Sequence, residues 1–569
     1  MRQLLRDAQQ LSLLLLFCGR HQPVVTVRSA SSAASAGGGD YGDWRADALG
    51  LPVFSYTFDQ VTNSSSGTAY TPSAADPWSS IHWGELPLST ANTIRAHSEH
   101  IFQLGNSRLV VLASNFGAVL KTDDVQTSDM LEFHVNPAVG DNGNPGTEDH
   151  PLRSLTAARD SVRAMRAAHG DAMFCGAKVW LHTGTHSVLH LDAELDSGTP
   201  TFPIRYGAAP GANASISGGV EVPRESWRPW ASHPHILTAD LTVLGLSDFG
   251  ALPTQGGRVD GWCDQLSARG NKTQLFHTAG SMTLARYPNI DADSSYHFLN
   301  AASGSSIETN SSFSMHSGPT AKRMVGWLAE EAPYLHGYWQ ADYADQIVSF
   351  VGAVTLPNGT VAMQTGVKPG VSGAGDCKTN ARFWGLNLLS ELDSPREYFI
   401  TKSGTIYYWP ELPISMWSAV PVVSSVGIGV KLDETSHVTL DSVMVRHAKG
   451  TGISAIGVTS VSVTNCTVHG IGGDGVTIFQ ALKSGISNSR IFDVGCTGVH
   501  VTGGNFTTLE PGLNWATGNR IHNMSRYKRT QQPGLQWSGV SEYNNAWSIV
   551  CLPVCLRLEL TERYCLSSS

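Results

Sequence analysis

Three aspartates in the C-terminal half of the chain carry the side chains best suited to acid–base chemistry. Glycoside hydrolysis needs two carboxyl groups about 5 to 10 Å apart, one protonated and one ionised. Asp474 and Asp493 are the candidate catalytic groups, and Asp441 is the third acid of this region. A structural role is the alternative for both candidates, because an aspartate such as Asp474, directly before Gly475, is typical of a turn.

Histidine, cationic and aromatic side chains of the same region suit the recognition of a sugar. An imidazole can move a proton or bind a hydroxyl, and cations beside an aromatic ring suit an acidic or stacked sugar. The alternative is a solvated, charged surface. The candidate substrate-binding residues are His469, His500, Arg526, Lys528, Arg529 and Trp537.

A polysaccharide lyase would need a different set of groups. It would combine a Lys or Arg base with calcium held by carboxylates. The sequence has no tight Asp/Glu cluster and no Cys/His spacing typical of a metal site. We therefore expect no metal and no cofactor, and we favour a hydrolase over a lyase.

A repeat must position these candidate residues. The segments VTLDSVMVRHAKGTGI, VSVTNCTVHGIGGDGV and SGISNSRIFDVGCTGV start at 438, 461 and 484, so the period is 23 residues. Their aligned positions repeat apolar residues, as in the column Leu440, Val463 and Ile486. A unit of this length cannot bury its own apolar face and gains a core by stacking, which predicts the coils of a β-helix.

The segments before the repeat predict a cap and an insertion. Apolar residues at helical spacing follow Ser154, a candidate N-cap, and this helix is expected to cover the open end of the solenoid. Between 222 and 425 the period is lost, and aromatic segments such as GTIYYWPELP indicate an inserted β-rich module. The expected organisation is a signal peptide at 1–36, a β-rich leader module at 37–130, the capping helix and first coils at 131–222, the inserted module at 223–425, the coils at 426–547 and a divergent tail at 548–569.

The order of several segments adds a family resemblance. FHVNPAVGDNGNPGTEDHPLRSLTAARDSVR, ISGG, LARYPN, GYWQADYAD, the coils, VTGGNFTTLEPGLN and SRYKRTQQPGLQWSGV resemble pectin-lyase-like right-handed β-helix proteins over roughly residues 130 to 545. The chain is most similar to glycoside hydrolase family 141, which contains α-L-fucosidases and xylanases. The resemblance implies an all-β fold, a right-handed parallel β-helix solenoid with an N-terminal capping helix and an inserted β-rich module.

The chain also departs from this family. The family loop similar to GGDRKTLTPGNN is replaced by the segment from Gly503 to Glu510, and the coils are expected to stop after Val540. Relatives continue through further coils that carry the family's carboxylates, so the resemblance implies a C-terminal truncation. Because this superfold hosts hydrolases, lyases and non-catalytic proteins, the fold alone does not fix the activity.

Composition and the N-terminus bear on the compartment and the partners. An apolar stretch from Leu11 to Cys18, too short to span a bilayer, and a small-residue site before Gly37 predict a secreted protein. Eight Asn-x-Ser/Thr sequons agree with export. The net charge of −9, without a basic stripe, argues against nucleic acid as a partner. Cys263 and Cys377, both in the inserted module, are expected to form a disulfide.

The functional hypothesis is a secreted carbohydrate-active protein of glycoside hydrolase type that handles a plant or algal polysaccharide. The alternatives are a β-helix that binds glycan or matrix without turnover, and an inactive truncated product. Within the coils, Asn465 and Asn488 share a column, and we expect them to form an inward-facing asparagine ladder. The sequence leaves the sugar, the linkage and the oligomeric state open.

Overall fold

The structure is a computed structural model of the chain. It describes residues 130–169, 174–252, 271–278, 280–290, 298–302, 312–367, 377–505 and 507–539, and the backbones of a few strands outside these ranges. The chain divides into two compact units, of which the smaller includes residues 1–132. In that unit an antiparallel sheet has the order β2-β1-β3-β4-β5, with bounds Tyr56–Thr57, Val25–Val27, Ser98–Leu104, Ser107–Ser114 and Gly117–Thr122.

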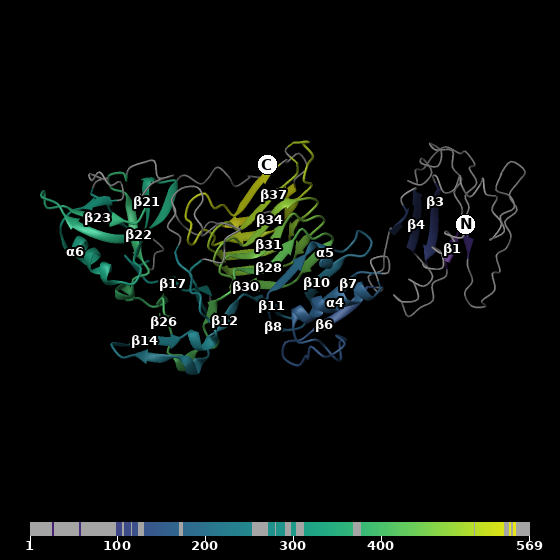
Figure 1. The fold of residues 1–569 in the computed structure, drawn as a ribbon, viewed down its shortest axis with the longest axis horizontal. Coiled ribbons are helices and arrows are strands. Elements are labelled where there is room, and N and C mark those ends of the chain that lie inside the picture. The colour runs from purple at the N-terminus through teal and green to yellow at the C-terminus, as the bar shows by residue number, and fades with distance from the viewer. Residues whose placement is uncertain are drawn as a thin grey trace, which may run out of the picture. The chain divides into compact units, whose positions relative to one another are not determined.

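Parallel strands of the larger unit form three sheets, which we number in the order in which each coil visits them (Figure 1). The first sheet contains β6 (Leu131–Val135), β7 (Ala177–Leu181), β10 (Ile204–Ala208), β29 (Val438–Asp441), β32 (Ser462–Thr464), β35 (Gly485–Ser487), β38 (Trp515–Thr517) and β41 (Asn545–Trp547). The second contains β8 (Gly184–His186), β11 (Ala214–Ser217), β30 (Met444–Arg446), β33 (Thr467–Ile471), β36 (Arg490–Val494), β39 (Arg520–His522) and β42 (Val550–Leu552). The third contains β9 (Leu189–Asp192), β28 (Ile428–Asp433), β31 (Thr451–Ile456), β34 (Val476–Ala481), β37 (Val499–Gly503) and β40 (Leu535–Gly539).

The strand register confirms the predicted repeat. Leu440 pairs with Val463 and Val463 with Ile486, each 23 positions apart, and all three side chains are buried. The next coil is longer, and Ile486 pairs with Ala516. Burying a side chain of this size stabilises the fold by about 1.5 to 3 kcal/mol, and every coil adds such residues on each of its three sides. The core is therefore a stack of apolar columns.

The corner between the first and second sheets is two residues long in the last coils, and its first residue is in the left-handed conformation. Asn465, Asn488 and Gly518 occupy this position in successive coils with φ of 54°, 50° and 66°. Asparagine and glycine tolerate this conformation better than other residues. Both asparagine side chains are exposed. The expected inward ladder at Asn465 and Asn488 is therefore wrong, because the left-handed residue turns its side chain to solvent.

The inward polar ladders lie elsewhere, on both sides of the first sheet. Asn519, 1% exposed, accepts a hydrogen bond from the backbone N of Ser489 at 2.9 Å and donates to the carbonyl of Ile486 at 3.1 Å. Asn514 makes the same two bonds, with the backbone N of Ser484 and with the Ala481 carbonyl, at 3.0 Å each. These amides satisfy backbone groups that the corners would otherwise leave buried and unpaired.

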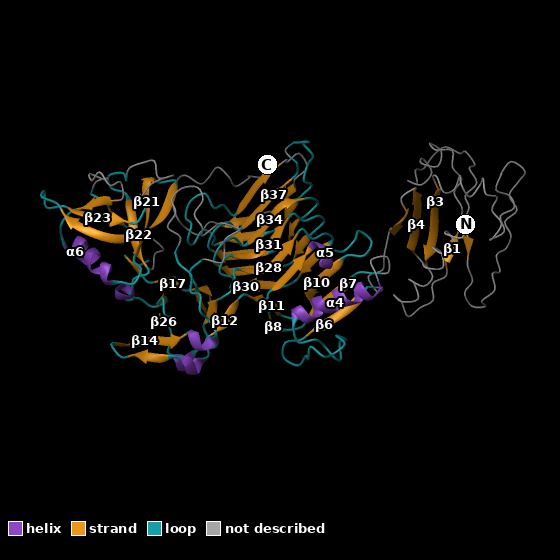
Figure 2. Ribbon diagram, in the orientation of Figure 1, coloured by secondary structure: helices purple, strands orange, loops and turns teal. Residues whose placement is uncertain are grey.

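One coil is interrupted by the long insertion. β11 and β28 belong to the same coil, since β11 pairs with β30 and β28 pairs with β31. The chain between them forms further sheets, as Figure 2 shows. One sheet has the order β12-β27-β15-β16, with bounds Gly219–Glu221, Val422–Ser424, Leu275–His277 and Gly280–Ser281. A second has the order β13-β14-β26-β25-β17, with bounds Arg228–Trp230, His233–Asp240, Thr405–Tyr408, Glu397–Ile400 and Thr283–Leu284. A third has the order β18-β24-β21-β22-β23-β20, with bounds Arg286–Tyr287, Arg382–Leu386, Tyr334–Ala341, Ala344–Thr355, Val361–Thr365 and Ser312–Met315.

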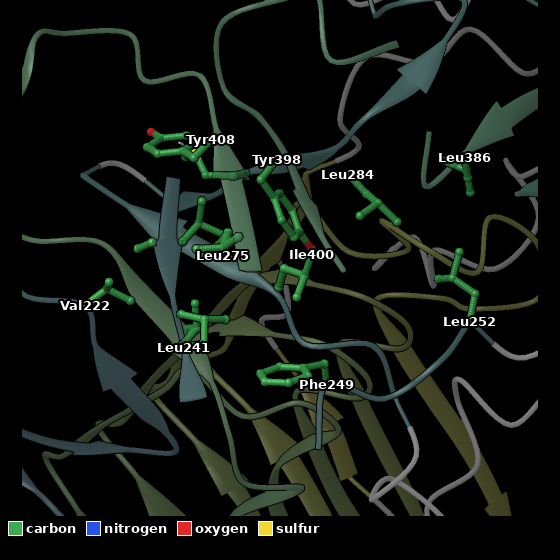
Figure 3. Packing of buried hydrophobic residues seen from close by; sticks show 14 of the residues in the cluster. Val222, Leu241, Phe249, Leu252, Leu275, Leu284, Leu386, Tyr398, Ile400 and Tyr408 are labelled. Atoms are coloured by element: carbon green, nitrogen blue, oxygen red, sulfur yellow. Dashed lines mark hydrogen bonds between the residues drawn. The ribbon is translucent and has the colours of Figure 1, made fainter. Parts of the chain in front are cut away.

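The insertion shares a hydrophobic core with the solenoid corner. Figure 3 shows part of this cluster, including Phe249, Leu275 and Tyr408 from the insertion. Cys496 from the coils belongs to the same cluster, and Tyr527 packs against it. The insertion is therefore fixed along the corner between the second and third sheets. The boundaries proposed for the inserted module remain predictions.

Helix α4 (Leu155–His169) begins where the sequence predicts. The Ser154 hydroxyl accepts a hydrogen bond from the backbone N of Ala157 at 3.2 Å, as expected of an N-cap. Arg163 pairs with Asp196, in the short helix α5 (Ala193–Asp196) that follows β9, with Nη2–Oδ2 at 2.5 Å. This ion pair joins α4 to the first coil. The role of α4 as a cap of the solenoid remains a prediction.

Parallel pairing extends further along the chain than the sequence predicts. We expected the coils to stop after Val540, with a divergent tail from 548. However, β41 pairs with β38 and β42 pairs with β39, so residues 550–552 continue the second sheet. No helix in the described residues is long and apolar enough to cross a membrane.

The inward hydrogen bonds of Asn519 can be tested through their effect on stability. Asn519→Ala should lower the free energy of unfolding by about 2 to 4 kcal/mol, because it leaves a buried N–H and a buried carbonyl without partners. Asn488→Gly, at the exposed left-handed corner, is the matched control and should be close to neutral. Denaturant unfolding of both variants measures the difference, and equal stabilities would contradict the ladder.

Candidate functional site

The candidate Asp474 lies at the end of the corner that leads into the third sheet. It directly precedes Gly475 and β34, and its side chain is only 4% exposed. Its Oδ1 accepts a hydrogen bond from the backbone N of Thr497 in the next coil at 3.0 Å, and the Thr497 hydroxyl donates to Gln532 Oε1 at 2.6 Å. The Asp474 side chain therefore joins its coil to the next, and Thr497 continues the link to the coil after that, which agrees with the structural role weighed for Asp474.

The candidate Asp493 lies at the start of the same corner, one coil further on, in the left-handed conformation with φ of 53°. Its Oδ2 accepts hydrogen bonds from the backbone N and the hydroxyl of Ser281 at 3.0 and 2.8 Å. Its Oδ1 lies 2.9 Å from Nε of Arg526. The carboxylate thus ties β36 to the inserted strand β16. Asp474 and Asp493 occupy different columns, and each is held by protein groups.

The third acid lies on another side of the solenoid. Asp441 ends β29 in the first sheet and pairs with Arg205. Its Oδ1 also accepts from Nδ2 of Asn465 at 3.0 Å. The three coil aspartates are therefore not brought together as a catalytic pair.

The two candidate histidines lie on different sheets. His469, on the second sheet, stacks on Phe492 with the ring centroids 4.8 Å apart. His500, on the third sheet, contacts Phe479 edge-on at 6.1 Å. Burial lowers the pKa of each imidazole to about 4. Both rings are consequently neutral at physiological pH, and Nε2 of His469 lies 3.4 Å from Met444 Sδ.

The predicted basic cluster forms a corner loop between β39 and β40. Arg526 donates to the Ile471 carbonyl at 2.8 Å and to Gln274 Oε1 at 3.2 Å, in addition to its contact with Asp493. Lys528 is buried and donates to the Asp345 carbonyl at 2.7 Å. These two cations join the coils to the insertion, so their charges are already used within the protein.

Asp345 is the residue of this region whose importance the sequence does not reveal. Its carboxylate is almost fully buried and accepts hydrogen bonds from the backbone N atoms of Arg529 and Thr530, both at 2.9 Å. His336 Nε2 lies 2.6 Å from its Oδ2, and Lys528 Nζ lies 3.5 Å from its Oδ1. Burial opposes the charge, but these partners outweigh it and hold the pKa of Asp345 well below its usual value. Asp345 fastens β22 of the insertion to the corner loop.

The outer face of the third sheet contains a column of polar side chains. Lys431, Ser454, Thr477, His500 and Gln536 align on consecutive strands. Ser454 and Thr477 are 1% and 0% exposed, and within the described part of the chain their hydroxyl oxygens have no hydrogen-bond partner. A buried hydroxyl without a partner is unfavourable. Ser454 and Thr477 are covered by protein, so only Lys431, His500 and Gln536 of this column reach solvent.

Long connections flank this column on both edges of the third sheet. At one edge lie the insertion and the corner loop between β39 and β40. At the other edge lies the connection between β37 and β38, from Gly504 to Asn514. The first and second sheets share the two-residue corner, so each has a long connection on one edge only. The third sheet, with His500 and Trp537 on its last strands, is therefore the best candidate for a site walled on both sides.

A buried glutamate of the insertion has the pKa expected of a general acid but different surroundings. Desolvation raises the pKa of Glu397 to about 8, so its carboxyl is largely protonated at neutral pH. Its oxygens lie 3.2 to 3.3 Å from the backbone N atoms of Arg286, Asp393 and Ser394. The group holds a turn of the insertion, on a different sheet from the polar column.

The described cysteines are mostly buried. Cys377 is buried, and its Sγ contacts the Lys378 carbonyl at 3.6 Å. Cys263 lies outside the described residues, so the expected Cys263–Cys377 bridge remains a prediction. Cys496 is disulfide-bonded, and Cys466 is a buried thiol. No group of three or more metal-ligating side chains is found among the described residues.

Asp345 can be tested by an isosteric change. Asp345→Asn should lower the free energy of unfolding at neutral pH by about 3 kcal/mol, because it leaves Lys528 buried without its counter-charge. Since the folded pKa is depressed, this stabilisation is present at neutral pH and is lost only as the pH falls below the unfolded value of about 3.9. Asp342→Asn, at an exposed position, removes the surface ion pairs with Lys378 and Arg382 and should cost at most about 1 kcal/mol. If both variants lost the same free energy of unfolding in denaturant titrations, the result would contradict the role of Asp345 in fastening the insertion to the corner loop.

Removal of the Thr477 hydroxyl should instead raise the stability of the fold. Thr477→Val keeps the shape and removes an unpartnered buried hydroxyl, so it should stabilise the fold by about 1 kcal/mol. Thr497→Val, which removes a hydroxyl bonded to Gln532, should destabilise it by a similar amount. Thermal unfolding of the two variants checks the sign, and destabilisation by Thr477→Val would show that its hydroxyl is satisfied.

Comparison with known proteins agrees with the fold. Residues 421–550 match the model of the "Right handed beta helix region" family, and no curated protein sequence matches the chain. A solved structure described as "Glycoside hydrolase" is similar at 14% identity and a TM-score of 0.51, over 70% of this chain and 74% of that one.

Two further structures match less well. They are XylC in complex with xylose (11% identity, TM-score 0.30, 74% of this chain and 63% of that one) and the lacto-N-biosidase of glycoside hydrolase family 136 from Eubacterium ramulus (12% identity, TM-score 0.23, 74% and 58%). The chain thus spans less than two thirds of the length of either. Together with the parallel register, the family match shows that the C-terminal coils form a right-handed parallel β-helix.

Proposed function

We propose that this chain is a secreted, carbohydrate-active protein of glycoside hydrolase type that holds a polysaccharide along the third sheet. The observation that carries the proposal is the pair of half-buried polar side chains His500 and Gln536 on the last two strands of that face, between the long connections at both edges. A sugar chain suits this position, because the two groups lie on adjacent coils, about 4.8 Å apart.

The chemistry of the column suits a neutral, hydroxyl-rich ligand. A neutral imidazole such as His500 both donates and accepts hydrogen bonds. Phe479 faces outward beside the column and is partly exposed, so its ring can contact the apolar face of a sugar, whereas Trp537 is in register with the inward-facing residues Ile478 and Val501. The similarity in fold to a glycoside hydrolase adds support of a general kind. A fucosylated or xylan-type substrate, as in glycoside hydrolase family 141, is the more specific form of the proposal.

The second candidate is a glycan-binding β-helix without turnover, and a specific observation favours it. A glycosidase needs one free acid and one free base, or a nucleophile, at the scissile bond. Asp441, Asp474 and Asp493 instead accept hydrogen bonds from protein groups at three separate positions. None of these aspartates stacks on another, so binding is better supported than hydrolysis by the described coils.

Secretion would expose part of the sequon set to glycosylation. The asparagines of five sequons, Asn213, Asn358, Asn465, Asn505 and Asn523, are exposed. Asn271 is 2% exposed and donates to the Lys449 carbonyl at 3.2 Å, so it is closed to modification in the folded protein. The sequons at Asn63 and Asn310 and the expected leader at 1–36 lie outside the described residues.

Binding and turnover can be measured separately on the same protein. In affinity electrophoresis we expect xylan or a fucosylated polysaccharide to retard the protein. His500→Gln should weaken the affinity for that polysaccharide about tenfold, because it removes a well-placed hydrogen bond. His150→Gln, on an exposed loop, is the control and should leave binding unchanged. Release of reducing sugar would identify a hydrolase, and binding without release would identify the second candidate. Unchanged binding by His500→Gln would contradict the third-sheet site.

A further inference from the structure

The outer face of the second sheet has a composition unlike that of the third. Arg446, His469, Phe492 and His522 align on β30, β33, β36 and β39. A parallel column places Met444, Thr467, Arg490 and Arg520 on the same strands. Arg490 and Arg520 are exposed, and neither pairs with a carboxylate within the described chain. We call these two columns the basic face.

The rings on the basic face stack along the solenoid axis. His469 and Phe492 lie 4.8 Å apart at 3°, and Phe492 and His522 lie 5.1 Å apart at 6°. Because His469 and His522 stack on Phe492, this ring presents its edge to solvent, and the guanidinium carbon of Arg490 lies 4.5 Å from its centroid. The edge of an aromatic ring carries partial positive charge, and an imidazole edge adds N–H donors. The arginines and the ring edges therefore favour the same ligand, an anion.

The charges around this face are unbalanced. Burial is the main cause of the lowered pKa of His522, and Arg490 and Arg520 lower it further. Two acids lie at the margin: Glu221 near Arg446, and Asp493, whose carboxylate is bound by Arg526 and Ser281. The chain as a whole carries a net charge of −9. A cationic strip on an acidic protein indicates a specific anionic partner rather than general attraction.

We propose that the basic face binds an anionic polysaccharide, whose carboxylate or sulfate groups pair with Arg490 and Arg520. The paired strands place these guanidinium stems one coil apart, about 4.8 Å, close to the spacing of groups on adjacent sugars of an extended chain. This site is separate from the third-sheet site and does not depend on it. Nucleic acid fits less well, because the stacked rings leave no free face on which a base could stack.

The proposal is tested with defined polyanions and a charge-matched control. The probes are polygalacturonate for carboxylates, heparin for sulfates, dextran as a neutral polymer and single-stranded DNA. The test variant is Arg490→Gln/Arg520→Gln, and the control, Lys322→Gln/Lys402→Gln, removes two exposed charges from the insertion. All four positions are exposed, so circular dichroism should show every variant to be folded.

We expect the protein to bind one or both polyanions but not dextran, with a salt-sensitive affinity. The double arginine variant should lose about tenfold or more in affinity while the lysine control changes little. Loss with polygalacturonate alone would assign carboxylated glycans, and loss with heparin alone would assign sulfated ones. Equal losses in both variants, no binding of either polyanion, or equally tight arginine-dependent binding of DNA would overturn the proposal. His500→Gln should leave polyanion binding intact, which separates this test from that of the third-sheet site.

Discussion

The pairing of each strand with its equivalent in the next coil is the constraint on which the rest of this structure depends. Parallel hydrogen bonds fix the rise per coil, and the apolar columns of Leu440, Val463 and Ile486 bury one another only in that register. A shift by one residue would turn every inward side chain outward. The same register aligns the outward residues, so the solenoid holds lines of functional groups without further structure.

The corners determine where polar groups can enter this stack. Asn514 and Asn519 satisfy the backbone at either side of the first sheet, and Asp474 does so before the third. The insertion depends on the same corners, since Asp493 and Arg526 hold its strand β16 and residue Gln274. Asp345 adds a buried charge that joins the insertion to the last corner loop. A change in any of these polar groups therefore affects both the coils and the walls of the third-sheet site.

The sequence alone was sufficient for the coils but not for their corners. The period of 23 and the apolar columns follow from spacing and are present in the structure. The inward ladder was predicted one column away, at Asn465 and Asn488, because an asparagine column fits both a ladder and a left-handed corner. β10 and β29 pair although they lie 234 positions apart, so the local sequence of neither strand indicates its partner. The role of Asp345 likewise could not be predicted, because it depends on His336 and on the distant residues 528–530.

A crystal structure of the protein soaked with a xylan-type or fucosylated oligosaccharide most directly tests the binding of a polysaccharide at the third sheet. We expect sugar rings beside His500 and Gln536, between the insertion and the connection from β37 to β38. An oligosaccharide bound on another sheet, with the third-sheet face occupied only by protein side chains, would contradict it.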